Sequence, residues 1–241
     1  MDNKICGVHA VYEALASRRQ PIERIHIARD AHSAKLKDIL NLARERNIPV
    51  RKEERVILDR MTEGAVHQGI IAIASAFEYS DFEILFKAGN PLVIMLDGVE
   101  DPHNLGAVIR TAEACKVSGV VVPERHSAPV TPTVIKAAAG ASAYIPIVRV
   151  KNLVATIDEM KDRGLWIIGL DPAGTKNWTD FDYKGPVALV LGGEHRGVRR
   201  LVREHCDVLV RIPMLGNIAS LNISVAAGVI LYEVVRQRGL P

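Results

Sequence analysis

The apolar residues of positions 1–76 alternate between helical and strand-like spacing. Val8, Val11 and Leu15 recur three and four positions apart, which is the spacing of one helix face. Residues 24–27 alternate between polar and apolar side chains, as a half-buried strand does. Residues 69–74 form a short apolar run after a glycine, which is typical of a buried strand. The pattern therefore predicts a first domain that is a small α/β unit.

Weaker signals lie in the middle and at the end of this unit. Ser33 is a candidate N-cap for a helix whose apolar stripe lies within residues 36–43. Val50 precedes a charged stretch, and residues 56–61 fit one short helix. Residues 77–90 are expected to be a linker that includes a short helix.

Residues 91–241 show the alternation of strands and helices that is typical of a parallel sheet covered by helices. Residues 92–96 form a continuous apolar run, as a strand buried on both faces does. Thr131 and Pro132 offer an N-cap followed by proline at the first helical position. The expected strands are 92–96, 119–122, 145–148, 165–170, 187–191 and 208–212, and the expected helices are 105–116, 131–139, 153–163, 198–204 and 221–238.

The composition is that of an ordinary globular protein, with 48% hydrophobic and 24% charged residues. No apolar run approaches the roughly 20 residues of a membrane span, and the first residues lack the pattern of a signal peptide. Cys6, Cys115 and Cys206 are far apart, and no cysteine or histidine cluster suggests a metal site or a disulfide framework. We therefore expect a cytoplasmic protein with no metal and no membrane partner.

The distribution of charge is more informative than its sum. The net charge is +3; residues 1–76 hold 13 basic and 10 acidic side chains, whereas residues 77–241 hold 18 of each. The whole excess of 13 − 10 = +3 thus lies in the first third of the chain. A positive surface there would attract phosphates, and a solvated helix face explains the excess equally well.

Two common nucleotide-binding motifs are missing from the sequence. Residues 97–104, which follow the first strand of the second domain, lack the G-x-G-x-x-G pattern of dinucleotide sites, and the chain has no P-loop. Residues 192–197 (GGEHRG) are rich in glycine after a strand, but their spacing differs. A plain strand-to-helix turn also explains these glycines.

Three segments in a fixed order carry the most specific pattern: DPHNLGAVIRTAEA at 101–114, LVLGGEHRGV at 189–198 and IPMLGNIASLNISVAAGVILYE at 212–233. Together they resemble the three motifs of the SpoU/TrmH family of RNA ribose 2'-O-methyltransferases. The resemblance implies an α/β catalytic domain at 91–241 with a deep trefoil knot near its C-terminus. It also implies S-adenosylmethionine as cofactor, no metal, and a homodimer that packs near the knot.

Two segments of the first domain extend the resemblance to essentially the whole chain. Residues 7–15 and 67–70 are similar to the N-terminal RNA-binding domain of the family's ribosomal-RNA branch, which resembles a small ribosomal-protein fold. The resemblance implies that the substrate is a guanosine ribose of 23S ribosomal RNA. Aromatic residues make up only 5% of the chain, so we expect recognition through phosphates, hydroxyls and RNA shape rather than through base stacking.

The resemblance implies five catalytic candidates, which are Asn104 and Arg110 in the first motif, Glu194 in the second, and Ser220 and Asn222 in the third. In the family, the arginine at the position of Arg110 takes part in activating the ribose hydroxyl. Because a guanidinium stays protonated in proteins, it is a poor base. We therefore expect it to stabilise the forming alkoxide.

Structural alternatives remain for several of these residues. Arg110 could be a helix-surface arginine, and Ser220 an N-cap. Glu194 is expected to orient Arg110 or an RNA group, and its structural alternative is a carboxylate of a surface turn. Asn222 lies in the first turn of an otherwise apolar helix, where a structural reason is harder to find, so a role in the active site is favoured.

Six residues are implied to bind the cofactor: Gly192, Gly193, Gly197, Ile212, Met214 and Leu221. Glycine lets the main chain approach a ligand closely. Ile212 and Leu221 are expected to hold the adenine through main-chain groups and apolar walls.

Two departures from the family pattern stand out. Residues 139–143 resemble a loop that often ends in glutamate, where this chain has Ala143, so a carboxylate contact to RNA or a partner is not expected there. His195 and Arg196 follow Glu194, where many relatives have small or acidic residues. These two side chains either contact RNA or face solvent.

Two other functions stay open on the sequence. One is a transfer-RNA ribose methyltransferase, which would use the same chemistry on another substrate. The other is a non-catalytic RNA-binding or ribosome-assembly factor that keeps the fold. The joint presence of Asn104, Arg110, Glu194, Ser220 and Asn222 argues against a binding-only protein, which would not need all five.

Overall fold

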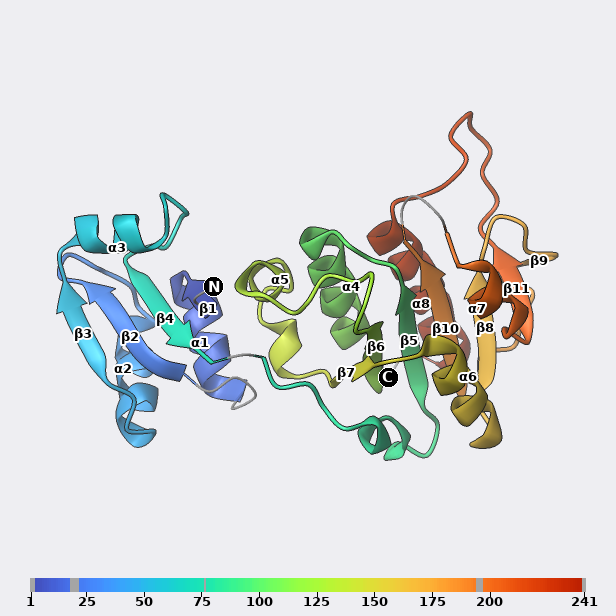
Figure 1. Ribbon diagram of the computed structural model, residues 1–241, viewed down its shortest axis with the longest axis horizontal. Helices are drawn as coiled ribbons and strands as arrows, with labels where there is room; N and C mark the ends of the chain where they lie inside the picture. The colour runs from blue at the N-terminus through green and yellow to red at the C-terminus, as the bar shows by residue number, and fades with distance from the viewer. Residues whose placement is uncertain (1–2, 18–21, 76, 194–196, 240–241) are drawn as a thin grey trace. The chain divides into compact units, whose positions relative to one another are not determined.

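The structure, a computed structural model, describes residues 3–17, 22–75, 77–193 and 197–239 (Figure 1). The contacts between residues divide the chain into two compact units. The first unit comprises Met1–Glu78 and Val130–Tyr144, and the second comprises Tyr79–Pro129 and Ile145–Pro241. The chain therefore leaves the second unit after Pro129 and re-enters it at Ile145.

A four-stranded sheet in the order β1-β4-β2-β3 forms the centre of the first unit. β4 (Ile70–Ala74) is antiparallel to β1 (Asn3–Cys6) and to β2 (Ile22–Ala28), whereas β3 (Val50–Glu53) is parallel to β2. The helices of this part are α1 (Val8–Ser17), α2 (Leu36–Glu45) and α3 (Arg55–Met61). The predicted helices and the strands at 24–27 and 69–74 are confirmed within a few residues.

Local polar groups explain where the prediction for this unit is wrong. β3 was not predicted because Arg51 and Lys52 are exposed and charged, which an edge strand tolerates. The N-cap of α2 is Lys35 rather than Ser33. The hydroxyl of Ser33 instead accepts a hydrogen bond from Lys35 N at 3.3 Å, in a turn ahead of the helix.

The two N-terminal segments that carry the family resemblance, which begin at Gly7 and at His67, lie side by side. Gly7 N donates to the carbonyl of Ile70 at 3.1 Å, and Val8 N donates to Gln68 Oε1 at 3.1 Å. Because Val8 is the first residue of α1, Gln68 satisfies one of the unpaired donors at the start of that helix. Both segments therefore have a structural role at the junction of β1, α1 and β4.

Helix α5 (Pro132–Ala137) and the short turn η2 (Ala141–Ala143) belong to the first unit, although their sequence lies between two strands of the second. The hydroxyl of Tyr144 donates a hydrogen bond to Glu13 Oε2 at 2.5 Å. Ala143 is buried. The position that often carries glutamate in the family therefore packs as an apolar residue in this chain.

The second unit contains a seven-stranded sheet in the order β7-β6-β5-β10-β8-β11-β9, and every pairing in it is parallel. β5 (Leu92–Asp97), β6 (Gly119–Pro123) and β10 (Val187–Gly192) are buried along almost their whole length, as strands covered on both faces are. The predicted α/β class with a parallel sheet is confirmed. Further elements are β7 (Ile147–Val150), β8 (Trp166–Leu170), β9 (Lys176–Asn177), β11 (Val208–Arg211), η1 (Phe82–Phe86), α4 (Pro102–Ala114), α6 (Leu153–Asp162), α7 (Arg200–Glu204) and α8 (Ile223–Arg238).

Caps and very short elements explain the differences in this unit. α4 begins at Pro102, earlier than predicted, because Asp101 Oδ1 accepts a hydrogen bond from His103 N at 2.8 Å and caps the helix. Thr131 occupies the predicted N-cap position of α5, but its side chain forms no capping bond. The strand β9 was not predicted, since two residues are too few to show a period.

Candidate functional site

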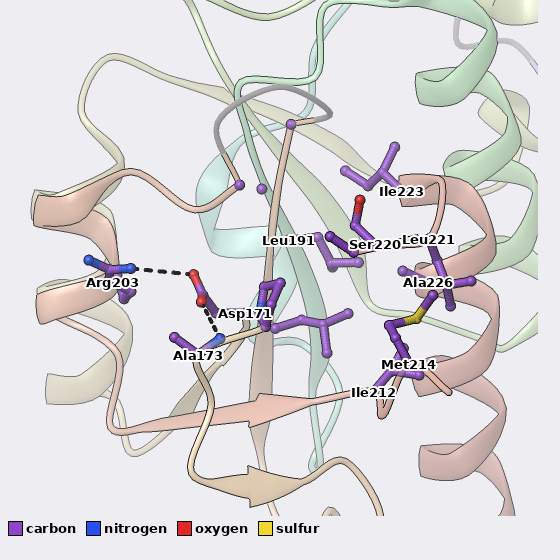
Figure 2. A pocket seen from close by; sticks show the side chains of 16 residues that line it. Asp171, Ala173, Leu191, Arg203, Ile212, Met214, Ser220, Leu221, Ile223 and Ala226 are labelled. Carbon is purple, nitrogen blue, oxygen red and sulfur yellow. Dashed lines mark hydrogen bonds and ion pairs between the residues drawn. The ribbon is translucent and has the colours of Figure 1, made fainter. Parts of the chain in front are cut away.

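A cavity of about 470 Å³ lies at the carboxyl ends of the neighbouring strands β8, β10 and β11 (Figure 2). It is lined by the ends of β8 and β10, by residues of the loop after β10, by α7 and by the chain between Ile212 and Ala226. Ligands of parallel α/β proteins bind at this edge of the sheet. The volume falls in the range of sites for small organic ligands, which is roughly 300–1,000 Å³.

All six residues predicted to bind a cofactor line this cavity: Gly192, Gly193, Gly197, Ile212, Met214 and Leu221. Figure 2 shows the side chains of Ile212, Met214 and Leu221 gathered on one side of the cavity. Folding thus brings the second and third sequence motifs into one cavity. An apolar wall of this kind suits the face of an aromatic ring.

Gly192 and Gly193 are required by close approaches of the main chain. A Cβ atom at Gly192 would lie 1.9 Å from the carbonyl carbon of Gly197, and one at Gly193 would lie 2.0 Å from the carbonyl oxygen of Gly98. Gly193 N also donates to the carbonyl of Asp97 at 2.8 Å. These glycines therefore have a structural reason, in addition to letting a ligand approach the main chain.

Asp97, at the end of β5, also binds Arg199, which lies at the far end of the loop that begins at Gly193. Its side chain has no exposed surface; Oδ1 accepts a hydrogen bond from Arg199 Nε at 2.6 Å, and Oδ2 accepts one from Arg199 N at 2.7 Å. Together with the bond from Gly193, Asp97 is bonded to both ends of the loop 193–199. Asp97 is not among the residues predicted from the sequence; the available signal is an acidic residue at the end of an apolar strand.

Two charged residues that the sequence analysis also missed line the cavity. Asp171 follows β8 directly, and its side chain is only 8% exposed. Asp171 Oδ1 accepts a hydrogen bond from Ala173 N at 2.8 Å, and Oδ2 lies 3.8 Å from Arg203 Nη1. Figure 2 places both charged side chains on the side opposite Met214. The signal available in the sequence is a charged residue at the carboxyl end of a predicted strand.

A polar cluster of Asn104, Asn222 and Ser224 joins the starts of α4 and α8, two helices that pack together. Asn222 Nδ2 donates to Asn104 Oδ1 at 3.0 Å. Asn222 Oδ1 accepts hydrogen bonds from Ser224 N at 2.9 Å and from Ser224 Oγ at 2.6 Å. Asn222, not the predicted Ser220, is therefore the N-cap of α8. Asn222 has a structural role that its sequence pattern did not indicate.

The remaining catalytic candidates differ in position. Ser220 lines the cavity, whereas Asn104, Arg110 and Asn222 are not part of its lining. Arg110 is exposed on α4 and forms no ion pair or side-chain hydrogen bond with any residue in the described ranges. Its guanidinium is thus available to an external anion. Glu194 lies outside the described residues, as do His195 and Arg196.

The described part of the chain contains no group of three or more His, Cys, Asp or Glu side chains that could hold a metal ion, and no helix there could cross a membrane. The three cysteines are free. Burial raises the pKa of the Cys115 thiol to about 11 and that of the Cys206 thiol to about 12. Little reactive thiolate is therefore present on these two residues at neutral pH.

Comparison with known proteins shows two matching families. Residues 91–232 match the SpoU rRNA Methylase family, and residues 4–80 match the family described as RNA 2'-O ribose methyltransferase substrate binding.

Individual relatives match over nearly the whole chain. The chain is 43% identical to the 23S rRNA (guanosine-2'-O-)-methyltransferase RlmB of Pseudomonas aeruginosa, which covers 98% of this chain and 96% of the relative. It is 41% identical to the putative TrmH family tRNA/rRNA methyltransferase YacO of Bacillus subtilis, and this match covers 97% of this chain and 95% of that relative. The crystal structure of the SpoU methyltransferase AviRb from Streptomyces viridochromogenes, in complex with the cofactor AdoMet, superposes with a TM-score of 0.85 at 27% identity and covers 98% of this chain and 90% of that one.

Proposed function

Because this chain belongs to the SpoU rRNA methylase family, we propose that it is an S-adenosylmethionine-dependent methyltransferase that modifies a ribose 2'-hydroxyl of RNA, on a guanosine of 23S ribosomal RNA. The observation that carries this proposal is the cavity at the ends of β8, β10 and β11, where all six predicted cofactor-binding residues meet. The similarity to RlmB over nearly the whole chain supports guanosine and 23S RNA as the substrate.

The cavity fits S-adenosylmethionine in size and in lining. The apolar side chains of Ile212, Met214 and Leu221 would hold the adenine, and the main chain at Gly192 and Gly193 would approach the ligand closely. Asp171 and Arg203, on the opposite side of the cavity, offer charged partners for polar groups of the ligand. When bound, S-adenosylmethionine supplies a methyl group activated by a positively charged sulfur.

Arg110 is proposed as the residue that meets the ribose. Its guanidinium carries five N–H donors, remains protonated, and has no ion-pair partner in the described ranges. It would donate hydrogen bonds to an RNA phosphate and to the 2'-oxygen as negative charge develops there. The hydrogen bond between Asn104 and Asn222 would position the helix that carries Arg110. Ser220 and Glu194 complete the proposed catalytic set.

We propose residues 1–76 as the RNA-binding domain, 77–90 as the linker and 91–241 as the catalytic domain, although residues 130–144 of this last range belong to the first compact unit. The match of residues 4–80 to a substrate-binding family supports the first of these. An electrostatic contact to phosphates would weaken steeply as salt is added.

Three finer features also belong to the proposal: a deep trefoil knot in the catalytic domain, a homodimer and a cytoplasmic location. Val225 and Tyr232 on α8 are 51% and 58% exposed, and the small residues Ala226, Ala227 and Gly228 lie between them. Ala227 is fully buried and Ala226 lines the cavity. The exposed side chains of Val225 and Tyr232, seven residues apart on one face of the helix, are therefore what supports a subunit interface there. Light scattering on purified protein would give about twice the mass of one chain.

Two alternatives are less well supported. A transfer-RNA substrate would use the same cavity; the relatives named for 23S ribosomal RNA alone match at 43% identity, whereas YacO, which matches at 41%, is named for either RNA. A binding-only factor would not need a cofactor cavity.

The test is transfer of labelled methyl groups from S-adenosylmethionine to unmodified ribosomal and transfer RNA, with the products separated by size. We expect label on 23S RNA in a single dinucleotide that resists alkali, because a 2'-O-methyl group blocks cleavage at that step. Label on transfer RNA would overturn the substrate and keep the chemistry. If folded, cofactor-binding protein labels neither naked RNA nor precursor ribosomal particles, the enzymatic proposal is wrong.

A further inference from the structure

We propose that Asp171 accepts hydrogen bonds from the ribose hydroxyls of the bound nucleoside cofactor. This inference rests on the proposed function and adds a binding residue that lies outside the three sequence motifs. It begins from the position of Asp171, which lies between the end of β8 and the cavity. The neighbouring strand β10 pairs with β8 through Leu191 and Leu170, so Asp171 lies beside the Gly192 turn.

The main chain of Asp171 is held from both sides. Its N–H donates to the carbonyl of Val210 at 3.0 Å, and its carbonyl accepts from Gly174 N at 2.9 Å. A Cβ atom at Gly174 would lie 2.6 Å from the carbonyl carbon of Val210, so this turn allows no larger residue. The carboxylate therefore projects from a fixed support, as a binding group in a preorganised site does.

The carboxylate of Asp171 has unused capacity to accept hydrogen bonds. An ionised carboxylate offers about four acceptor positions. Oδ1 accepts one bond, from Ala173 N at 2.8 Å, and Oδ2 lies 3.8 Å from Arg203 Nη1, which is too far for a hydrogen bond. No other side-chain bond to Asp171 occurs within the described ranges. Buried polar atoms are almost always hydrogen-bonded. Oδ2 of this side chain, which is 8% exposed, accepts no hydrogen bond from the described residues, so at the cavity wall it calls for a donor from the ligand.

The neighbouring charge selects the kind of donor. S-adenosylmethionine carries three kinds of donor: the neutral ribose hydroxyls, the exocyclic amine of the adenine and the cationic ammonium of its amino-acid end. The proposed adenine site at Met214 lies on the side of the cavity opposite Asp171 (Figure 2), so the hydroxyls and the ammonium remain. Arg203 already places one positive charge 3.8 Å from Asp171, and a second cation on the same carboxylate would be repelled by it. Neutral hydroxyls meet no such repulsion. The ribose is therefore the part of the cofactor that suits Asp171.

The first test compares two ligands on the variant Asp171→Asn. S-adenosylhomocysteine and 5'-methylthioadenosine share the adenosine, but the second lacks the amino-acid end. We expect calorimetry to show both ligands weakened by a similar factor, about ten- to a hundredfold, because an acceptor of strong hydrogen bonds is replaced by a donor. The control Asp162→Asn removes an exposed carboxylate on α6 and should leave both affinities unchanged.

Other results would overturn the inference. Weakening of S-adenosylhomocysteine alone would place Asp171 at the amino-acid end, and unchanged affinity for both ligands would exclude a contact with the cofactor. Wild-type protein that binds neither ligand would instead refute the proposed function, so the two failures are distinguishable.

A second test does not depend on the folding of a variant. The 2'-deoxy and 3'-deoxy forms of 5'-methylthioadenosine lack one hydroxyl each. We expect wild-type protein to bind at least one of them about tenfold or more weakly than the parent compound, and folded Asp171→Asn to bind parent and deoxy forms alike. Equal binding of all three compounds by the wild type would overturn the inference.

Discussion

The cofactor cavity and the polar cluster at the starts of α4 and α8 are built by different means. The cavity depends on main-chain approaches, such as that of Gly193 to Gly98, and on apolar side chains. The cluster depends on the side chains of Asn104 and Asn222, with exposed Arg110 on the same helix as Asn104. Under the proposed function, cofactor binding and methyl transfer therefore rely on separable parts of the molecule.

The two substrates supply the physical reason for this difference. A small cofactor is bound by shape, and close packing of glycine and apolar residues defines shape well. RNA is a large polyanion that arrives from solvent, so the groups that meet it have to be exposed and positive. A substitution in the cavity should therefore change cofactor affinity, and one at Arg110 should change transfer alone.

Arg110→Ala is the sharpest test of this separation. We expect kcat for methyl transfer to fall about 100- to 1,000-fold, because a cation that stabilises developing charge is lost. Affinity for S-adenosylhomocysteine should stay unchanged, since Arg110 is not part of the cavity lining. Arg110→Lys keeps the charge without the fork of donors and should retain part of the activity. A parallel loss of kcat and cofactor affinity in Arg110→Ala would contradict the separation.

Gly193→Ala tests whether the close approach of the main chain at Gly193 maintains the cavity. The added Cβ would lie 2.0 Å from the carbonyl oxygen of Gly98, so the turn has to move. We expect the free energy of unfolding, measured by urea denaturation, to fall by about 3 kcal/mol, and cofactor affinity to fall with it. Gly89→Ala is the matched control, because nothing lies within 4 Å of its Cβ. Equal stability of the two variants would show that the turn is not tightly constrained.

Asn222 lies where the two regions meet, since Leu221 and Ile223 on either side of it line the cavity. Asn222→Ala should lower the free energy of unfolding by about 1 kcal/mol through loss of the N-cap of α8. Asn222→Asp keeps the capping oxygen but loses the Nδ2 donor to Asn104, so it should keep stability and lower the rate of transfer. If Asn222→Asp transfers methyl groups at the wild-type rate, the link between the two helices has no part in catalysis.

Glu233 belongs to neither region and should affect stability alone. Hydrogen bonds from Arg236, at 2.7 Å, hold the pKa of the buried Glu233 carboxyl below its ordinary value of 4.5. A lowered pKa in the folded state adds stability above the unfolded pKa, and this stability is lost as the pH falls below it. Glu233→Gln should thus be less stable than wild type at pH 7, by at most about 1 kcal/mol. The difference in urea midpoint should shrink below pH 4.5, and kcat at neutral pH should not change.

The secondary structure was predictable where burial is continuous. The apolar runs that became β5 and β10 are buried on both faces, so they were predicted almost to the residue. Prediction was wrong where a single polar side chain decides at which residue a helix begins, as Asp101 does for α4 and Asn222 does for α8. It also missed short or charged strands such as β3, because pairing with β2 rather than local pattern makes that segment a strand.

The sequence by itself determined the α/β class, the order of the longer strands and helices along residues 91–241 and, through resemblance, the six cofactor-binding candidates and Arg110. Only the tertiary structure decided that the six candidates line one cavity, and that Asp97, Asp171 and Arg203 support it. The reason is physical: Asp97 and Arg199 are 102 residues apart, and a lone charged residue at a strand end has no periodic signal. Its partner is set by which strands the sheet places side by side.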